Sequence, residues 1–196
     1  MEKAKLKNKI NRIMRIGLVG LTLATSTLAD PFPKKEPLKE ITFTQEEENI
    51  LSTQYLKDYE FYMNNNKPMT AIFLIFNTME LNLNIKDGKE KIKSALSKLE
   101  EEKEYLNAAT MGLEFNEYLD TEEEINENTN RAAENYKQFA EYLMHIGSKA
   151  YNGKPGRGMI TSEEYLERAK KLFEETGNSQ GIEDCNEILE SLKEAK

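Results

Sequence analysis

The sequence predicts an all-α fold, and three of its features support this prediction. Apolar residues after residue 38 recur at the three- to four-residue spacing of one helix face. Helix-start and turn signals separate these apolar stretches. The 196 residues include only 10 Gly, 5 Pro and no Trp, with few clusters of β-branched residues. Helices joined by short turns form antiparallel hairpins, which we expect to be stacked as a short array or closed into a helical bundle.

Residues 1–29 have the pattern of a secretory signal peptide. Six basic residues and one acidic residue precede an apolar run at 16–28. Thr27 and Ala29 are small residues, three positions and one position before a cleavage site. The alternatives are a cytoplasmic amphipathic start and an uncleaved anchor, although a spanning helix needs about 20 mainly apolar residues. We expect an exported protein in the periplasm, at the cell surface or outside the cell, either free or anchored in the membrane by residues 16–28.

Removal of this leader would leave a strongly acidic chain. The sequence has 27 Lys and Arg and 35 Asp and Glu, of which the leader holds 6 and 1, so 21 and 34 are left and the net charge is −13. Such a surface repels the phosphates of nucleic acids and of anionic membranes. We therefore expect a protein or peptide partner, no nucleic acid, and membrane contact only through an uncleaved N-terminal segment.

A Pro-rich linker at 30–37 separates the leader from a helical domain at 38–196. Three prolines in the linker exclude a helix and favour an extended spacer. Cys185 is the only cysteine, so an internal disulfide is excluded. Its place on an apolar helix face predicts a buried structural thiol, with an intermolecular disulfide or a reactive thiol as the alternative.

Two helices are predicted at the start of the domain. The capping box Thr44-x-x-Glu47 begins a helix that reaches about Met63. Pro68 suits the first turn of the next helix. The apolar segment 69–76 also fits a buried strand, but we expect a helix because apolar residues continue to Leu83.

A long helix is predicted over 89–119, after the turn Lys86-Asp87-Gly88. Its apolar face has the spacing of a helix and consists of Ile92, Leu96, Leu99, Leu106, Ala109 and Leu113. The charged stretch Glu100–Glu104 is expected on the solvated side of this helix.

Three more helices complete the predicted six. The capping boxes Thr121-x-x-Glu124 and Thr161-x-x-Glu164 begin helices that run to about residues 151 and 176. A Gly-rich loop at 153–158 separates them. Gly177-Asn178 ends the second of these helices, and Ser179 begins the last helix of the chain.

The C-terminal third of the chain resembles the tetratricopeptide repeat, a helix-turn-helix unit. Gly147 is similar to the small residue at which the two helices of such a repeat touch. Ala169 followed by Phe173 matches the small-then-aromatic pattern of the second helix. The resemblance covers 134–195 and implies binding of a protein or peptide in a concave groove, without catalysis.

A degenerate copy of this unit is predicted upstream. The pattern at 94–102 is similar to that at 168–176, and a turn precedes it. Amphipathic helices rich in Leu produce such similarities readily. True repetition and unrelated helical packing therefore both stay open for residues 67–196.

The sequence lacks the usual patterns for catalysis or metal binding. His145 is the only histidine, so zinc sites of Cys and His and di-iron sites of helical bundles are excluded. The acidic clusters 46–48 and 122–124 lie at helix starts, where acids stabilise the helix dipole. The stretch 82–88 fails the spacing of a calcium loop. We expect no enzyme, no cofactor and no metal.

We expect instead a non-enzymatic adaptor that binds a protein or peptide. The candidate binding residues combine exposed aromatic and polar groups of one helix with two cations of the Gly-rich loop. They are Asn135, Tyr136, Phe139, Tyr142, Lys154 and Arg157. Alternatively, Tyr136, Phe139 and Leu143 all pack against the neighbouring helix. An anchored envelope spacer and an exported helical glycan hydrolase with two catalytic carboxylates are the alternative functions.

The leader analysis predicts that the mature protein begins at Asp30, because Thr27 and Ala29 fit the small pockets of a signal peptidase. N-terminal sequencing of secreted material tests this directly. Recovery of a chain that still begins with Met1 from the membrane fraction would show an anchor instead.

Overall fold

The computed structural model describes residues 43–81, 83, 85, 87–150 and 161–194, with no account of the side chains of 147–150. The predictions for the leader, the linker and the loop that contains Lys154 and Arg157 lie outside the described residues. Every regular element within the described ranges is helical, so the all-α class is confirmed. None of these helices combines the length and apolar character needed to cross a membrane.

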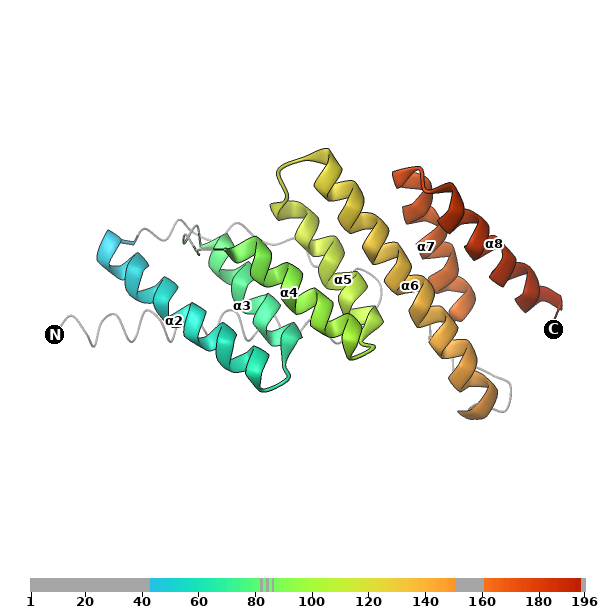
Figure 1. Ribbon diagram of the computed structural model, residues 1–196, viewed down its shortest axis with the longest axis horizontal. Coiled ribbons are helices and arrows are strands. Elements are labelled where there is room, and N and C mark those ends of the chain that lie inside the picture. Colours follow the sequence, from blue (N-terminus) through green and yellow to red (C-terminus); the bar gives the residue numbers. More distant parts are fainter. Residues whose placement is uncertain (1–42, 82, 84, 86, 151–160, 195–196) are drawn as a thin grey trace. The chain divides into compact units, whose positions relative to one another are not determined.

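Seven α-helices and one 3-10 helix form the described part of the chain (Figure 1). They are α2 (Gln45–Asn64), α3 (Pro68–Glu80), α4 (Gly88–Glu101), α5 (Tyr105–Phe115), η1 (Asn116–Tyr118), α6 (Glu122–Ala150), α7 (Ser162–Thr176) and α8 (Ser179–Glu194). The helices expected near α2, α6, α7 and α8 are confirmed with almost the same bounds. The segment 69–76 is confirmed as a helix.

The chain divides into two compact units, and the described part of the first contains α2 up to Glu60 and residues 73–81, 83 and 85. The capping box at the start of α2 is confirmed. The Thr44 hydroxyl accepts from the Glu47 amide at 3.3 Å, and the Thr44 amide donates to the Glu47 carboxylate at 3.0 Å. Leu51, Tyr55 and Tyr59 then follow at four-residue spacing, and all three are buried.

The predicted continuation of the second helix to Leu83 is wrong. α3 ends at Glu80, and the Leu83 amide donates to the Thr78 carbonyl at 3.1 Å, five residues back. Leu83 is nevertheless buried. The apolar character of Leu83 therefore reflects its burial. The spacing of apolar residues alone does not distinguish a buried residue outside a helix from a residue within the helix.

The predicted long helix at 89–119 is also wrong, because the chain forms α4, α5 and η1 over this stretch. The break is a Schellman motif. The Lys103 amide donates to the Glu100 carbonyl at 2.9 Å, and the Glu104 amide donates to the Leu99 carbonyl at 2.8 Å. Lys103 has a φ of 61°, in the left-handed region that glycine or asparagine usually occupies at this position.

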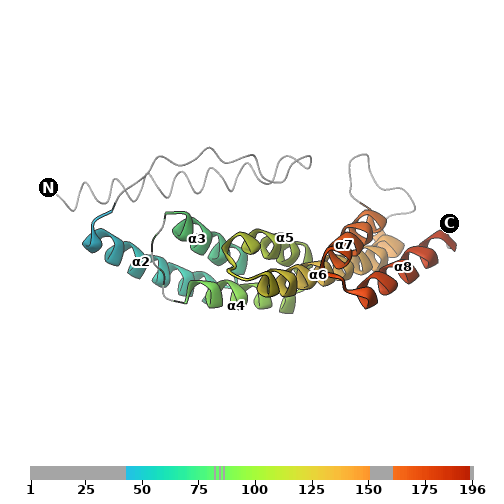
Figure 2. The ribbon, with the colours of Figure 1, turned by 90° about the horizontal axis from the view of Figure 1, so that it is seen from above.

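The second unit comprises residues 61–72 and 87–196, and its described helices α4 to α8 pack in sequence order. α5 packs on α4, α6 on α5, α7 on α6 and α8 on α7. Figure 2 shows α5 and α7 on one side of this row and α4 and α8 on the other. This stacking of neighbours is compatible with a helical-repeat arrangement.

One hydrophobic core joins α5, α6, α7 and α8. Its buried residues are Ala109, Ala133, Tyr136, Ala140, Tyr165, Leu166, Ala169, Phe173, Cys185 and Leu189. Ala169 is fully buried, as expected for a close contact between helices. Cys185 is confirmed as a buried thiol, and burial raises its pKa to about 11. The thiol is therefore protonated at neutral pH.

An added methyl group is expected to have opposite effects on stability at two helical glycines. A Cβ at Gly181 would lie 2.6 Å from the buried ring of Phe173, whereas a Cβ at Gly112 would lie 3.7 Å from the Ala132 Cβ, an ordinary contact. We expect Gly181→Ala to destabilise the fold by about 1–3 kcal/mol through overpacking. Gly112→Ala should stabilise it by about 0.5–1 kcal/mol, because alanine loses less backbone entropy in a helix.

Urea unfolding of the two variants measures both effects against the wild type. A neutral result for Gly181→Ala would show that the Phe173 ring can move, and would contradict the packing described above.

Candidate partner-binding surface

Four aromatic rings from α6 and α7 form a continuous aromatic row. Tyr136 stacks on Tyr165 with the ring centroids 6.0 Å apart. Phe139 meets Tyr165 edge to face at 5.0 Å, and Tyr142 stacks on Phe139 at 6.4 Å. Each such pair contributes about 0.5–1.5 kcal/mol beyond the area that it buries. The row therefore holds its rings in fixed positions.

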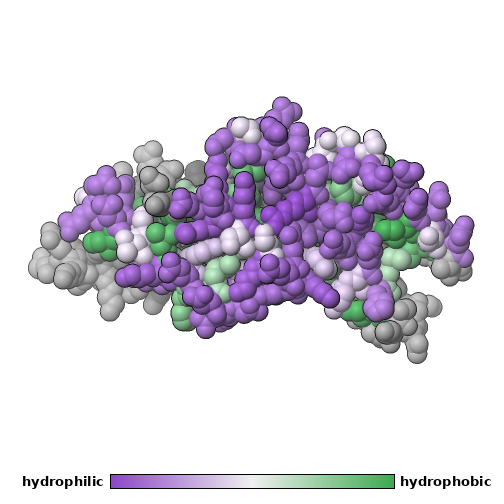
Figure 3. Space-filling model, in the orientation of Figure 1, coloured by the Kyte–Doolittle hydropathy of each residue, from purple (hydrophilic) through white to green (hydrophobic). Residues whose placement is uncertain are grey.

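Exposure rises along the aromatic row. Tyr136 and Tyr165 are buried, and Phe139 is half-buried. Tyr142 is 46% exposed and reaches solvent. Tyr142, Ile50 and Phe61 are the large hydrophobic residues that are exposed within the described ranges. The molecular face shown in Figure 3 is mostly hydrophilic, with small separate hydrophobic patches. Tyr142 thus gives the row a solvent-accessible end.

A cation also contacts the row. The Arg168 guanidinium carbon lies 5.6 Å from the centroid of the Tyr165 ring, a distance at which the ring face attracts a positive charge. Burial raises the pKa of Tyr165, and the Arg168 charge opposes this shift. The Tyr165 hydroxyl is neutral at ordinary pH, as an unshifted tyrosine would be.

The structure separates the predicted binding residues into three groups. Tyr142 and, in part, Phe139 are accessible. Tyr136 and Asn135 are buried, and the Asn135 amide donates to the Glu100 carboxylate at 2.7 Å. Lys154 and Arg157 lie outside the described residues. The structure therefore brings Tyr136, Phe139 and Tyr142 together in the aromatic row and places Asn135 in the contact with α4 instead.

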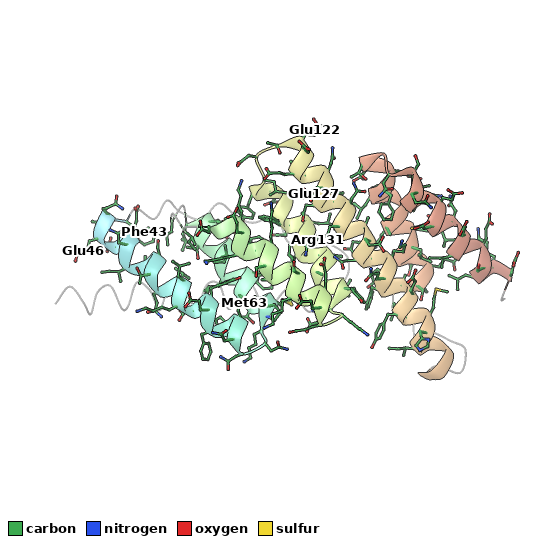
Figure 4. All side chains as sticks on the ribbon, in the orientation of Figure 1. Phe43, Glu46, Met63, Glu122, Glu127 and Arg131 are labelled. Atoms are coloured by element: carbon green, nitrogen blue, oxygen red, sulfur yellow. The ribbon has the colours of Figure 1, made fainter. Side chains whose placement is uncertain are left out.

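Glu100 is an exception within the charged stretch Glu100–Glu104, which was expected to be mostly solvated. Arg131 of α6 donates to both carboxylate oxygens of Glu100, at 2.7 and 2.8 Å, and also to the Ser97 hydroxyl at 2.8 Å. The Glu100 side chain is 28% exposed. Figure 4 labels Arg131 on α6. This bidentate pair, with Asn135, ties α6 to α4.

The pKa of Glu100 reflects this network. Burial on its own raises that pKa, but the hydrogen bonds from Arg131 and Asn135 and the charge of Arg131 outweigh it, so the pKa is lowered from its ordinary value. Neither Glu100 nor Arg131 was predicted as a contact residue. The available signal was the four-residue spacing of Arg131 and Asn135, which places them on one face of α6.

A second polar contact, the ion pair between Lys137 and Asp184, joins α6 to α8. The Lys137 ammonium lies 3.0 Å from the Glu134 carboxylate and 3.0 Å from the Asp184 carboxylate, and its side chain is 12% exposed. Burial lowers the pKa of Lys137, but the two carboxylates outweigh this effect and raise it. Lys137 is therefore charged in the folded protein. The sequence analysis did not identify this residue either.

Among the residues that the structure describes, no group of three or more His, Cys, Asp or Glu side chains could hold a metal ion. We also compared the chain with known protein families, curated proteins and solved structures, and none of them matches it significantly.

The lowered pKa of Glu100 predicts a pH-dependent contribution to stability. A depressed folded-state pKa stabilises the fold above the unfolded-state value, about 4.3, and this contribution is lost as the pH falls through the folded-state pKa. We expect Glu100→Gln to cost about 1–2 kcal/mol at pH 7, and progressively less in acid.

Urea unfolding between pH 7 and pH 3 measures this difference. Glu101→Gln, at an exposed neighbouring position, is the matched control and should change stability little. A constant cost of Glu100→Gln over the whole pH range would contradict the proposed charge interaction.

Proposed function

We propose that this chain is an exported, non-enzymatic helical-repeat protein that acts as an adaptor for a protein or peptide partner. The observation that carries the proposal is the aromatic row, which ends in the exposed ring of Tyr142. Aromatic side chains held in place by their neighbours are frequent anchors of protein interfaces, because little side-chain entropy is lost on binding. Tyr142 and Phe139 would contact the partner directly.

The buried members of the predicted set, Tyr136 and Asn135, have supporting roles in this proposal. Tyr136 stacks on Tyr165, and Tyr165 in turn contacts the ring of Phe139, whereas Asn135 is held by Glu100 of α4. In the proposal, Tyr136 therefore positions Phe139 through Tyr165, and Asn135 helps to hold α6 against α4. Lys154 and Arg157 stay predicted contributors from the loop.

The resemblance to a tetratricopeptide repeat belongs to the same proposal. α6 and α7 pack closely, and Ala169 and Phe173 lie in the core that they share, as the small-then-aromatic pattern requires. Sequential stacking of α4 to α8 supports a repeat arrangement, in which each unit contacts mainly its neighbours. Such arrays commonly bind peptides and proteins on an extended surface.

Partner capture tests the proposal with a matched pair of variants. Tyr142→Ala removes the exposed end of the row, and Phe61→Ala removes an exposed aromatic residue of α2 instead. We expect the wild type and Phe61→Ala to retain the same partner and Tyr142→Ala to lose at least about tenfold in affinity, as for an interface hot spot. Circular dichroism should show equal helical content in all three proteins.

Two results would oppose the proposal. Equal capture by a folded Tyr142→Ala variant would move the binding site elsewhere. Failure of the wild type to retain any partner reproducibly would oppose the adaptor function and favour a spacer.

A further inference from the structure

α8 is attached to the rest of the second unit in three different ways along its length. At its start, the Asn130 side-chain oxygen of α6 accepts from the Thr176 hydroxyl at 2.7 Å and from the Asn178 amide at 3.1 Å. The Asn178 side chain in turn accepts from the Gly181 amide at 3.0 Å. These hydrogen bonds therefore hold the turn between α7 and α8 against α6.

The second attachment is the ion pair between Lys137 and Asp184, and Asp184 lies less than two turns into α8. Asp184 accepts from Lys137 at 3.0 Å and from the neighbouring Gln180 side chain at 2.8 Å. Lys137 also pairs with Glu134 of its own helix. Without the Lys137–Asp184 ion pair, both carboxylates would still be partly solvated, because the Glu134 and Asp184 side chains are 43% and 37% exposed.

The third attachment is apolar and shallow. The Cys185 and Leu189 side chains of α8 are buried, whereas Ile182, Ile188 and Leu192 pack against the core but are only partly buried. Within the described helices, α8 packs mainly against α7 alone. A terminal helix of a stacked array with so few buried contacts opens at a lower free energy than the array as a whole.

We infer that α8 is a latched cap, which opens about the pinned turn at Gly177-Asn178 independently of the other helices. The Lys137–Asp184 ion pair is the latch, and Cys185 lies on the face that opening uncovers. Opening exposes the apolar side of α7 around Phe173, a surface that the closed state hides. Because the Asp184 side chain of this pair is 37% exposed, salt partly screens the latch and favours the open state.

Native-state thiol labelling of Cys185 in the full-length protein measures this opening. The thiol is fully buried in the closed state, so a thiol reagent such as DTNB reacts only after α8 has moved. Cys185 is the only thiol in the chain, so the signal has one source. The ratio of the labelling rate to that of the unfolded chain gives the population of open states.

A matched pair of lysine variants isolates the latch. Lys137→Met keeps the apolar stem and removes the charge, and Lys171→Met removes the lysine of an exposed pair with Glu175, in which the side chains are 77% and 53% exposed. We expect Lys137→Met to accelerate labelling about tenfold, the change that one partly buried charged hydrogen bond supports. Lys171→Met should leave the rate unchanged.

Salt and hydrogen exchange complete the test. Raising NaCl from 0.1 to 1 M should accelerate labelling of the wild type and leave Lys137→Met unaffected. Amides of α8 should exchange faster in Lys137→Met, with α6 and α7 unchanged. Equal rates for the two lysine variants would overturn the latch. A labelling free energy equal to that of global unfolding would overturn independent opening.

Discussion

α6 presents small side chains to the helices on both sides of it, and the second unit depends on the close approach that these side chains permit. Ala132, Ala133 and Ala140 are essentially fully buried. Ala133 and Ala140 belong to the core shared with α5, α7 and α8, and Ala132 lies near the position where a Cβ on Gly112 of α5 would stand. Larger side chains here would separate the helices, break the aromatic row and lengthen every polar contact that α6 makes.

Polar groups of α6 then fix how its neighbours are aligned along it. Asn128 donates to the Gly112 carbonyl of α5 and, at 2.7 Å, to Asn116. Asn130 binds the turn between α7 and α8, and Asn135 binds Glu100 of α4. All buried side-chain polar atoms within the described ranges have hydrogen-bond partners. A shift of any neighbour by one turn would leave such a group without a partner, at a cost of about 1–3 kcal/mol each.

Features that depend on a few adjacent residues could be predicted from the sequence, and features that depend on distant contacts could not. The capping box at Thr161 and Glu164 lies within four residues and was confirmed with both of its hydrogen bonds. The break at Lys103 was missed, because lysine is an unusual residue for a left-handed helix end. Glu100 was assigned to solvent, because its partner Arg131 lies 31 residues away. For the same reason, the pattern identified the aromatic positions of α6 but left open which of them are buried, and contact with Tyr165 of α7 decides this.

The lengths of the helices account for the exposure of Tyr142. α6 has 29 residues, whereas α5 has 11 and α7 has 15. At about 1.5 Å per residue, α6 extends some 20 Å or more beyond what either neighbour alone can cover. Counting back along α5 from the Asn128–Gly112 hydrogen bond, its start at Tyr105 lies level with about residue 135 of α6, by the equal rise per residue of two antiparallel helices. Tyr142 therefore lies about two turns past the first residue of α5, and its ring stacks on Phe139 of its own helix. The accessible end of the aromatic row thus belongs to the part of the long central helix that extends beyond α5.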